Sequence, residues 1–145
     1  MEPTTIVGIG SAVMNVVIVD RAPLVRERLK ALLRTDVPQA DVIGEAADAQ
    51  VAIRLIEDAC PDVVILDLAL AGGSGFDVLR AVKLAPHPPI IIMLTNLTIP
   101  EYQVACLEAG AEFFLDKSFG MDLLADILGH LARRRRSDTR EEDRP

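Results

Sequence analysis

The chain has 145 residues, the size of one ordinary domain. Half of its residues are hydrophobic, which excludes a disordered chain. It contains no Trp, 4 Phe and 1 Tyr, so its core must be built from aliphatic side chains. Layered α/β domains with parallel strands have this kind of composition.

The formal net charge of −7 is unevenly distributed along the chain. Residues 1–132 carry 18 acidic and 9 basic residues, a net charge of −9. An acidic body argues against direct nucleic-acid binding, because phosphate contacts need clustered cations. Residues 133–145 carry 6 Arg and 4 acidic residues, a net charge of +2. We expect this stretch to be a charged, disordered tail that frays into solvent.

The two cysteines, Cys60 and Cys106, are too few for a disulfide framework or a metal knuckle. Each stands among apolar residues near the end of a predicted helix, so we expect both to be small buried hydrophobes. The sequence has no apolar run of the ~18–20 residues that a membrane span needs. It also lacks a signal-peptide pattern. We therefore expect a cytoplasmic protein without a membrane partner.

Five short runs rich in β-branched and aliphatic residues alternate with five helical stretches from residue 15 onward. Continuous apolar runs suit strands that are buried on both faces. The predicted strands are residues 16–19, 42–43, 63–66, 90–94 and 113–115. Residues 1–14 do not fit this repeat, and residues 6–12 could form either an extra strand or a flexible N-terminal arm.

The helices between these strands carry start and stop signals. Pro23 suits the first turn of the first helix, and Asp48 is positioned to cap the second, which Pro61 ends. Pro100 opens the fourth helix and Gly110 closes it. Apolar stripes mark helices over residues 25–33, 51–56, 76–82 and 123–131. The alternation predicts an α/β fold, a doubly wound sheet of five parallel strands covered on both faces.

Four polar residues fall at the carboxyl ends of predicted strands: Asp20, Asp67, Thr95 and Lys117. In an open parallel sheet, ligands bind in the crevice at this edge. Any one of these residues alone could be a helix cap or a turn residue. Together they define a site with an acid, a nucleophilic carboxylate, a hydroxyl and an ammonium group.

These residues lie in segments that resemble the response-regulator receiver family of two-component signal transduction. The resemblance covers about residues 15–131. It rests on residues 17–20 (VIVD), 61–68 (PDVVILDL), 94–95 (LT) and 107–111 (LEAGA), with Gly75 eight residues after Asp67, and with Lys117. The resemblance implies a receiver domain over residues 15–132. It also implies a flavodoxin-like (βα)5 fold with strand order 2-1-3-4-5.

The resemblance also implies a role for each site residue. Asp67 would accept a phosphoryl group from a histidine kinase or a phosphotransfer protein. Asp20 and Asp67 would help to hold Mg²⁺, with the backbone carbonyl of Ala69 as a further ligand. Thr95 and Lys117 would bind the phosphoryl oxygens. These roles agree with general chemistry, since a carboxylate can act as a covalent nucleophile and phosphoryl transfer depends on neutralising oxygen charge.

Two positions near the acceptor depart from the family pattern. Arg21 stands where the family has a second acid that contacts the metal, which puts the affinity for Mg²⁺ in doubt. The arginine could reach Asp67 and take the electrostatic place of the metal, or it could point to solvent. Asn96 follows Thr95 where a small residue is usual, and it could restrict access to the acceptor.

Two further departures lie on either side of Lys117. Phe114 stands at the position of the family's switch aromatic, often a tyrosine, and it lacks the hydroxyl that tyrosine offers. It could equally be an ordinary core aromatic. Ser118 replaces a proline that often follows the lysine. We expect the Lys117–Ser118 peptide bond to be trans, because a cis bond without proline costs ~3–4 kcal/mol.

The sequence therefore favours a single-domain receiver that is phosphorylated on Asp67 and signals through its fourth helix, fifth strand and fifth helix. Its enzymatic activity would be limited to self-phosphorylation and self-dephosphorylation. Only 14 residues follow Leu131, too few for a folded output domain, so the output would lie in another protein unless the chain is a fragment. The alternative is a phosphorylation-independent interaction module, motivated by Arg21 and Asn96.

Overall fold

The computed structural model describes residues 13–142, and it describes side chains only up to residue 135. The expectation of a strand or an arm at residues 6–12 lies outside the described residues. No helix within residues 13–142 is both long and apolar enough to cross a membrane.

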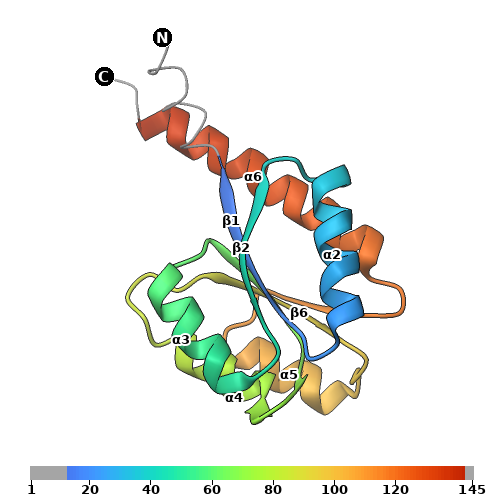
Figure 1. Cartoon of the computed structure of the whole chain (residues 1–145). Coiled ribbons are helices and arrows are strands. Elements are labelled where there is room, and N and C mark those ends of the chain that lie inside the picture. Colours follow the sequence, from blue (N-terminus) through green and yellow to red (C-terminus); the bar gives the residue numbers. More distant parts are fainter. Residues whose placement is uncertain (1–12, 143–145) are drawn as a thin grey trace.

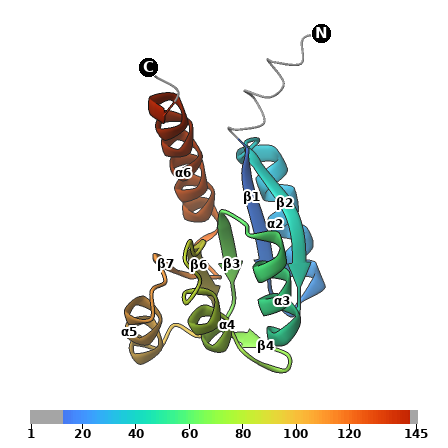
Figure 2. The ribbon, with the colours of Figure 1, turned by 90° about the vertical axis from the view of Figure 1, so that its left-hand side faces the viewer.

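A sheet of five parallel strands forms the centre of the molecule (Figures 1 and 2). Its order is β2-β1-β3-β6-β7, which confirms the predicted order 2-1-3-4-5 and the doubly wound class. The strands are β1 (Met14–Val19), β2 (Ala40–Ala46), β3 (Val63–Leu66), β6 (Ile90–Thr95) and β7 (Phe113–Asp116). The central strand β3 is entirely buried, because helices cover both faces of the sheet.

Five helices cover the two faces of the sheet, with α2 and α6 on one side and α3, α4 and α5 on the other (Figure 1). The helices are α2 (Pro23–Asp36), α3 (Ala49–Ala59), α4 (Gly75–Val82), α5 (Pro100–Glu108) and α6 (Met121–Glu142). Successive strand residues point to opposite faces. Val64 and Leu66 therefore pack with the second group of helices, and Val63 and Ile65 with the first. Full burial of each such aliphatic side chain contributes ~1.5–3 kcal/mol.

The ends of the helices follow the sequence signals, with one correction. Asp48 accepts hydrogen bonds from the backbone N–H groups of Gln50 and Val51, which confirms it as the cap of α3. Cys106 is buried in the core, as predicted, and this burial raises the pKa of its thiol. The expectation of burial is wrong for Cys60, which is exposed. Cys60 is the C-cap of α3, and its backbone is left-handed with φ 49°. The chain leaves the helix at this residue, so Cys60 does not continue the buried face of α3.

After β3 comes a small hairpin, which the sequence did not predict. Its strands β4 (Ala69–Leu70) and β5 (Gly73–Ser74) are antiparallel and only two residues each. Strands this short carry no periodicity, so only the glycine-rich turn marks them in sequence. Gly72 and Gly73 have φ values of 65° and 137°, which favour glycine. The hairpin carries the chain from β3 to the capping box that Ser74 and Asp77 form at the start of α4.

The last helix extends further than its apolar stripe predicts. Its stripe ends at Leu131, but the backbone of α6 is helical to Glu142. Ala132 is fully buried, and Arg135 forms an ion pair of 2.9 Å with Asp62 and donates to the carbonyl of Val13. These contacts support the helix over residues where the charge pattern favoured a frayed tail. The described backbone of residues 133–142 is helical, while the division of the chain into domain and tail stays a prediction.

Candidate functional site

The carboxyl ends of β1, β3, β6 and β7 bring the four expected residues to one edge of the sheet. The register pairs Val19 with Leu66 and Thr95 with Asp116, so Asp20, Asp67, Thr95 and Lys117 lie at or beside paired positions. Asp20, Asp67 and Thr95 are only 2%, 5% and 0% exposed. Polar side chains with so little exposure need partners, because burial of an unpaired polar group is costly.

Lys117 supplies the partner for both carboxylates. Its Nζ lies 2.7 Å from Oδ2 of Asp20 and 2.6 Å from Oδ2 of Asp67. Burial by itself lowers the pKa of the Lys117 ammonium, but the hydrogen bonds to Asp20 and Asp67 outweigh burial and raise its pKa overall. The lysine is therefore charged at neutral pH and bridges the two acids through charge-assisted hydrogen bonds.

The other oxygen of each aspartate is held by the backbone. Oδ1 of Asp20 accepts a hydrogen bond of 2.8 Å from the N–H of Ala22. Oδ1 of Asp67 accepts one of 3.3 Å from the N–H of Ala69. Both carboxylates are thus fixed in orientation by short loops that begin directly after their strands.

Thr95 is buried beside this cluster, but among the described residues its side chain makes no hydrogen bond to Asp20, Asp67 or Lys117. Its Oγ1 accepts a hydrogen bond of 3.2 Å from the N–H of Leu97, and its backbone carbonyl accepts one of 2.9 Å from the N–H of Lys117. Within the described residues, no hydrogen bond joins the Thr95 hydroxyl to Asp67. The hydroxyl proton is free to turn toward a new acceptor, since the bond to Leu97 uses only an oxygen lone pair.

Gly75 allows the backbone of α4 to lie directly against the acceptor strand. A Cβ atom at this position would lie 2.0 Å from the backbone carbonyl oxygen of Asp67. The Gly75 N–H also donates a hydrogen bond of 2.8 Å to the carbonyl of Leu68. The glycine that stands eight residues after Asp67 is therefore required for space, and it fixes the loop that carries the acceptor.

The four departures from the family pattern have clear positions in the structure. Arg21, Asn96 and Ser118 are exposed, and Phe114 is half-buried against the core. Of the two alternatives for Arg21, the structure has the solvent-exposed one, since no ion pair joins Arg21 to Asp67 among residues 13–135. The Lys117–Ser118 peptide bond is trans, as expected.

The donor set for a divalent cation is small. Across the part of the chain that the structure describes, no group of three or more His, Cys, Asp or Glu residues is arranged to hold a metal ion. The acidic ligands available at the site are Asp20 and Asp67. The Oδ2 atom of each lies within 2.7 Å of Nζ of Lys117. Two carboxylates suffice for a Mg²⁺ ion that keeps several of its water ligands. The residues present therefore fit such an ion, with fewer acids than the family pattern provides.

Two charged residues near the site were not singled out from the sequence. Arg26 of α2 donates to the backbone carbonyl of Asp20 at 2.6 Å and to Glu45 of β2 at 2.7 Å. Helix α2 carries three arginines, and nothing in their spacing marks Arg26 as different from Arg28 or Arg34. Only the packing of α2 against the end of β1 distinguishes it.

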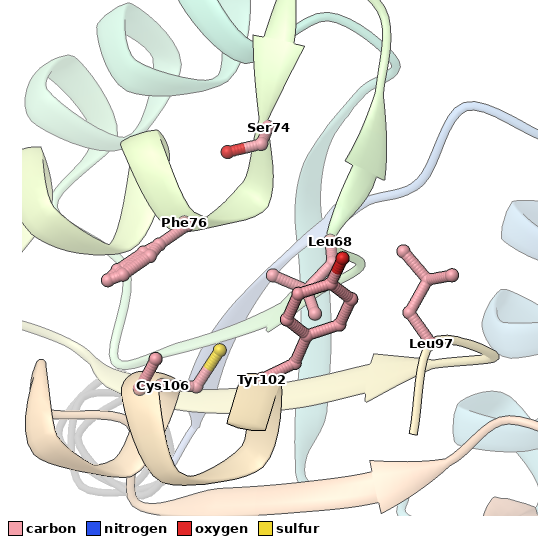
Figure 3. Close-up of a pocket in the computed structure, with 7 residues that line it drawn as sticks. Leu68, Ser74, Phe76, Leu97, Tyr102 and Cys106 are labelled. Carbon is pink, nitrogen blue, oxygen red and sulfur yellow. The ribbon is translucent and has the colours of Figure 1, made fainter. Parts of the chain in front are cut away.

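An apolar hollow of about 270 Å³ lies next to the acceptor loops, between α4 and α5 (Figure 3). Leu68 and Leu97 line it from the loops that follow Asp67 and Thr95, and the rings of Phe76 and Tyr102 line it from the two helices. The full lining consists of Leu68, Ser74, Phe76, Leu97, Tyr102, Ala105 and Cys106. The hollow lacks charged groups, so it is separate from the acidic acceptor cluster.

Comparison with known proteins places this fold and site in one class. Residues 16–129 match the model of the response regulator receiver domain. The chain is 36% identical over 110 residues to the transcriptional regulatory protein YdfI of Bacillus subtilis, covering 76% of this chain and 51% of that protein. It is 35% identical over 114 residues to the nitrate/nitrite response regulator protein NarP of Escherichia coli, covering 79% of this chain and 53% of that protein.

Solved structures agree with this assignment. The signal receiver domain of the putative response regulator NarL from Mycobacterium tuberculosis is 29% identical, with a TM-score of 0.76, and the match covers 83% of this chain and 97% of that one. The response regulator domain of Thermotoga maritima CheB is 25% identical, with a TM-score of 0.73, and the match covers 86% of this chain and 97% of that one. The chain belongs to the response regulator receiver domain family, and it spans about half the length of the curated relatives it matches.

Proposed function

We propose that this protein is a receiver whose Asp67 accepts a phosphoryl group from a histidine kinase or a phosphotransfer protein. The observation that carries the proposal is the bridge of Lys117 between the buried carboxylates of Asp20 and Asp67. The ammonium of Lys117 can turn from these carboxylates toward the oxygens of a phosphoryl group that becomes attached to Asp67. The protein would act as a signalling acceptor, with no enzymatic activity beyond its own phosphorylation and dephosphorylation.

The proposed reaction is a transfer of one phosphoryl group between two side chains. A carboxylate oxygen of Asp67 attacks the phosphorus atom of a phosphohistidine, the new O–P bond forms, and the P–N bond breaks with its electron pair returning to the imidazole. Lys117 then pairs with the phosphoryl oxygens in place of the bare carboxylate. Thr95 turns its hydroxyl proton toward another of these oxygens, since its bond to the N–H of Leu97 uses only an oxygen lone pair.

Mg²⁺ would be held by the carboxylates of Asp20 and Asp67 and by the backbone carbonyl of Ala69. When bound, the ion supplies positive charge beside the phosphoryl oxygens. Arg21 replaces an acid at this site and adds a cation next to Asp20, so we expect the affinity for Mg²⁺ to be lower than with an acid at position 21. Asn96 and Ser118 are exposed and directly follow Thr95 and Lys117 in the chain.

The signal would leave through the face formed by α5, β7 and α6, with Phe114 as the switch side chain. Helix α5 has little buried surface, since Cys106 is its single buried residue. Large apolar side chains are exposed on or next to α5 and α6, namely Ile99, Tyr102, Val104, Leu107, Phe119 and Leu123. Such a surface suits a protein partner. The relative YdfI is named a transcriptional regulatory protein, but the acidic body of this chain favours a protein target over direct nucleic-acid binding.

Two further expectations belong to this proposal. The protein would work in the cytoplasm, where its two free cysteines stay reduced. The division into an arm at residues 1–14, a receiver at 15–132 and a charged tail at 133–145 also stays a prediction.

A second candidate is a phosphorylation-independent interaction module with the same fold. The observation that favours it is the exposed Arg21 beside a site with only two carboxylates. In this case the face of α5, β7 and α6 would bind its partner without any change at Asp67.

Incubation with acetyl phosphate and Mg²⁺, followed by intact-protein mass spectrometry, separates the two candidates. We expect a mass increase of one phosphoryl group in the wild type and none in Asp67→Asn. If the wild type gains no mass while Arg21→Asp does, the second candidate is correct.

A further inference from the structure

A chain of charged contacts links the outer strand β2 to the acceptor site. Glu45 of β2 pairs with Arg26 of α2 at 2.7 Å, and Arg26 donates to the carbonyl of Asp20 at 2.6 Å. Asp20 pairs with Lys117, which pairs with Asp67. The contacts join strand ends that lie on both sides of Asp67, so a change at Arg26 can reach the acceptor through Asp20.

The carbonyl of Asp20 lies beyond the last residue of β1 that the sheet pairs, which is Val19. It therefore has no strand partner to fix it, and a hydrogen bond from a charged donor takes that place. The guanidinium of Arg26 makes this bond through Nη1 and binds Glu45 through Nε. Glu45 in turn pairs with Lys30, one helical turn further along α2.

The side chain of Arg26 is largely shielded from solvent. Its side chain is 16% exposed, whereas Arg28 on the same helix is exposed and makes no ion pair among the described residues. A planar guanidinium can hold two acceptors in fixed directions at once, which the single ammonium of a lysine does less well. The guanidinium therefore ties the start of the loop at Asp20 to Glu45 of β2.

We propose that Arg26, held in place by Glu45, is a positioning residue for the acceptor site, orienting the Asp20 carboxylate toward Lys117 and toward a bound cation. This inference rests on the proposed function of Asp67. Arg26 touches neither the acceptor nor the phosphoryl group, and it acts through the backbone of Asp20. Residues that orient a site ligand in this way typically change metal affinity or activity about 10–100-fold when they are replaced.

The test compares Arg26→Gln with the matched control Arg28→Gln, which removes the same charge from the same helix. Phosphorylation by acetyl phosphate is followed over time by mass spectrometry, and folding is checked by thermal unfolding. We expect Arg26→Gln to be phosphorylated about tenfold more slowly than the wild type. Arg28→Gln should match the wild type, Arg26→Lys should recover part of the rate, and Glu45→Gln should fall between the wild type and Arg26→Gln.

A spectroscopic readout tests the positioning directly. The N–H of Ala22 donates to Oδ1 of Asp20, so its amide resonance reports the orientation of that carboxylate. We expect this resonance to move in Arg26→Gln and in Glu45→Gln and to stay in place in Arg28→Gln.

The outcomes are distinct from those for the proposed function. An equal rate and an unmoved Ala22 resonance in a folded Arg26→Gln would overturn the positioning role while leaving Asp67 as acceptor. If the wild type is not phosphorylated, the proposed function fails, and the Ala22 resonance alone decides whether Arg26 orients Asp20. If Arg26→Gln does not fold, Glu45→Gln and Arg26→Lys carry the same comparison.

Discussion

Both ends of the parallel sheet place an aspartate beside a cation, but the two ends differ in how far water reaches the pair. At the carboxyl edge, the side chains of Lys117, Asp20 and Asp67 are 13%, 4% and 6% exposed. At the amino edge, the side chains of Arg135 and Asp62 are 40% and 25% exposed. The same kind of ion pair is thus shielded from water at the carboxyl edge, whereas at the amino edge it holds α6 against the start of β3 near solvent.

The physical reason for the difference is the number of charges and their burial. The carboxyl edge holds two acids against one ammonium in a site with little water, so any added anion must displace an existing contact. The amino edge holds one acid against one guanidinium near solvent, where water screens the pair. Variants at the two edges separate the effect of burial from the effect of charge.

Replacement of the acceptor should have the largest effect. We expect Asp67→Asn to abolish phosphorylation by acetyl phosphate completely, because the amide oxygen is a poor nucleophile compared with a carboxylate. The matched control is Asp62→Asn at the amino edge, which removes the same charge from the other ion pair. Mass spectrometry should show the phosphoryl group in Asp62→Asn, and phosphorylated Asp67→Asn would mean that the acceptor is another residue.

Removal of the bridging lysine should strongly change stability. Lys117→Met leaves two buried carboxylates without their cation, and loss of one partner of a buried pair costs ~3–5 kcal/mol. Arg135→Gln at the exposed pair should cost less than about 1 kcal/mol. Urea unfolding measures both. Equal losses in the two variants would show that burial does not separate the two edges.

Position 21 should control the affinity for Mg²⁺. We expect Arg21→Asp to bind Mg²⁺ at least about tenfold more tightly than the wild type, since it exchanges a nearby cation for a third acid, and this ratio corresponds to ~1.4 kcal/mol. Arg21→Gln removes the positive charge without adding an acid, and it should lie between the two. Titration with MgCl₂ followed by amide resonances near Asp67 measures the affinities. An unchanged affinity in Arg21→Asp would remove Arg21 as the cause of weak metal binding.

The smallest effect should come from the exposed cluster around Glu45. Hydrogen bonds from Lys30 and Arg26 lower the pKa of Glu45 below its usual value of 4.5. A carboxyl whose pKa is lowered by folding stabilises the protein above its unfolded pKa, and this contribution is lost as the pH falls through the lowered value. Stability should therefore depend less on pH below 4.5 in Glu45→Gln than in the wild type. High salt should weaken the difference, because these charges are near solvent.

The sequence predicted the fold well because its signals are local and repeated. Continuous apolar runs marked four strands and the centre of β2, and Asp48, Pro100 and Gly110 marked helix ends that the structure confirms. The hairpin of β4 and β5 was not predicted, because a strand of two residues is too short to show any periodicity. The exposure of Cys60 was not predicted, because its apolar neighbours in sequence do not reveal its left-handed C-cap position.

The candidate site could be predicted in outline for a related reason. Polar residues that interrupt the ends of buried strands stand out in sequence, and parallel strands bring their carboxyl ends to one edge. Arg26 and Glu45 could not be found in this way. They lie on exposed-looking positions of α2 and β2, and charged residues at such positions are most often solvated.

Three features follow from the amino-acid sequence alone: the order of the elements, the residues at the strand ends and the absence of a second acid beside Asp20. These features depend on residue types and spacing along the chain. Only the tertiary structure decided that Lys117 bridges both aspartates, that Arg21 faces solvent and that Arg26 holds the Asp20 carbonyl. Each of these depends on directions and distances between side chains from different strands and helices, and packing sets those only when the whole domain is assembled.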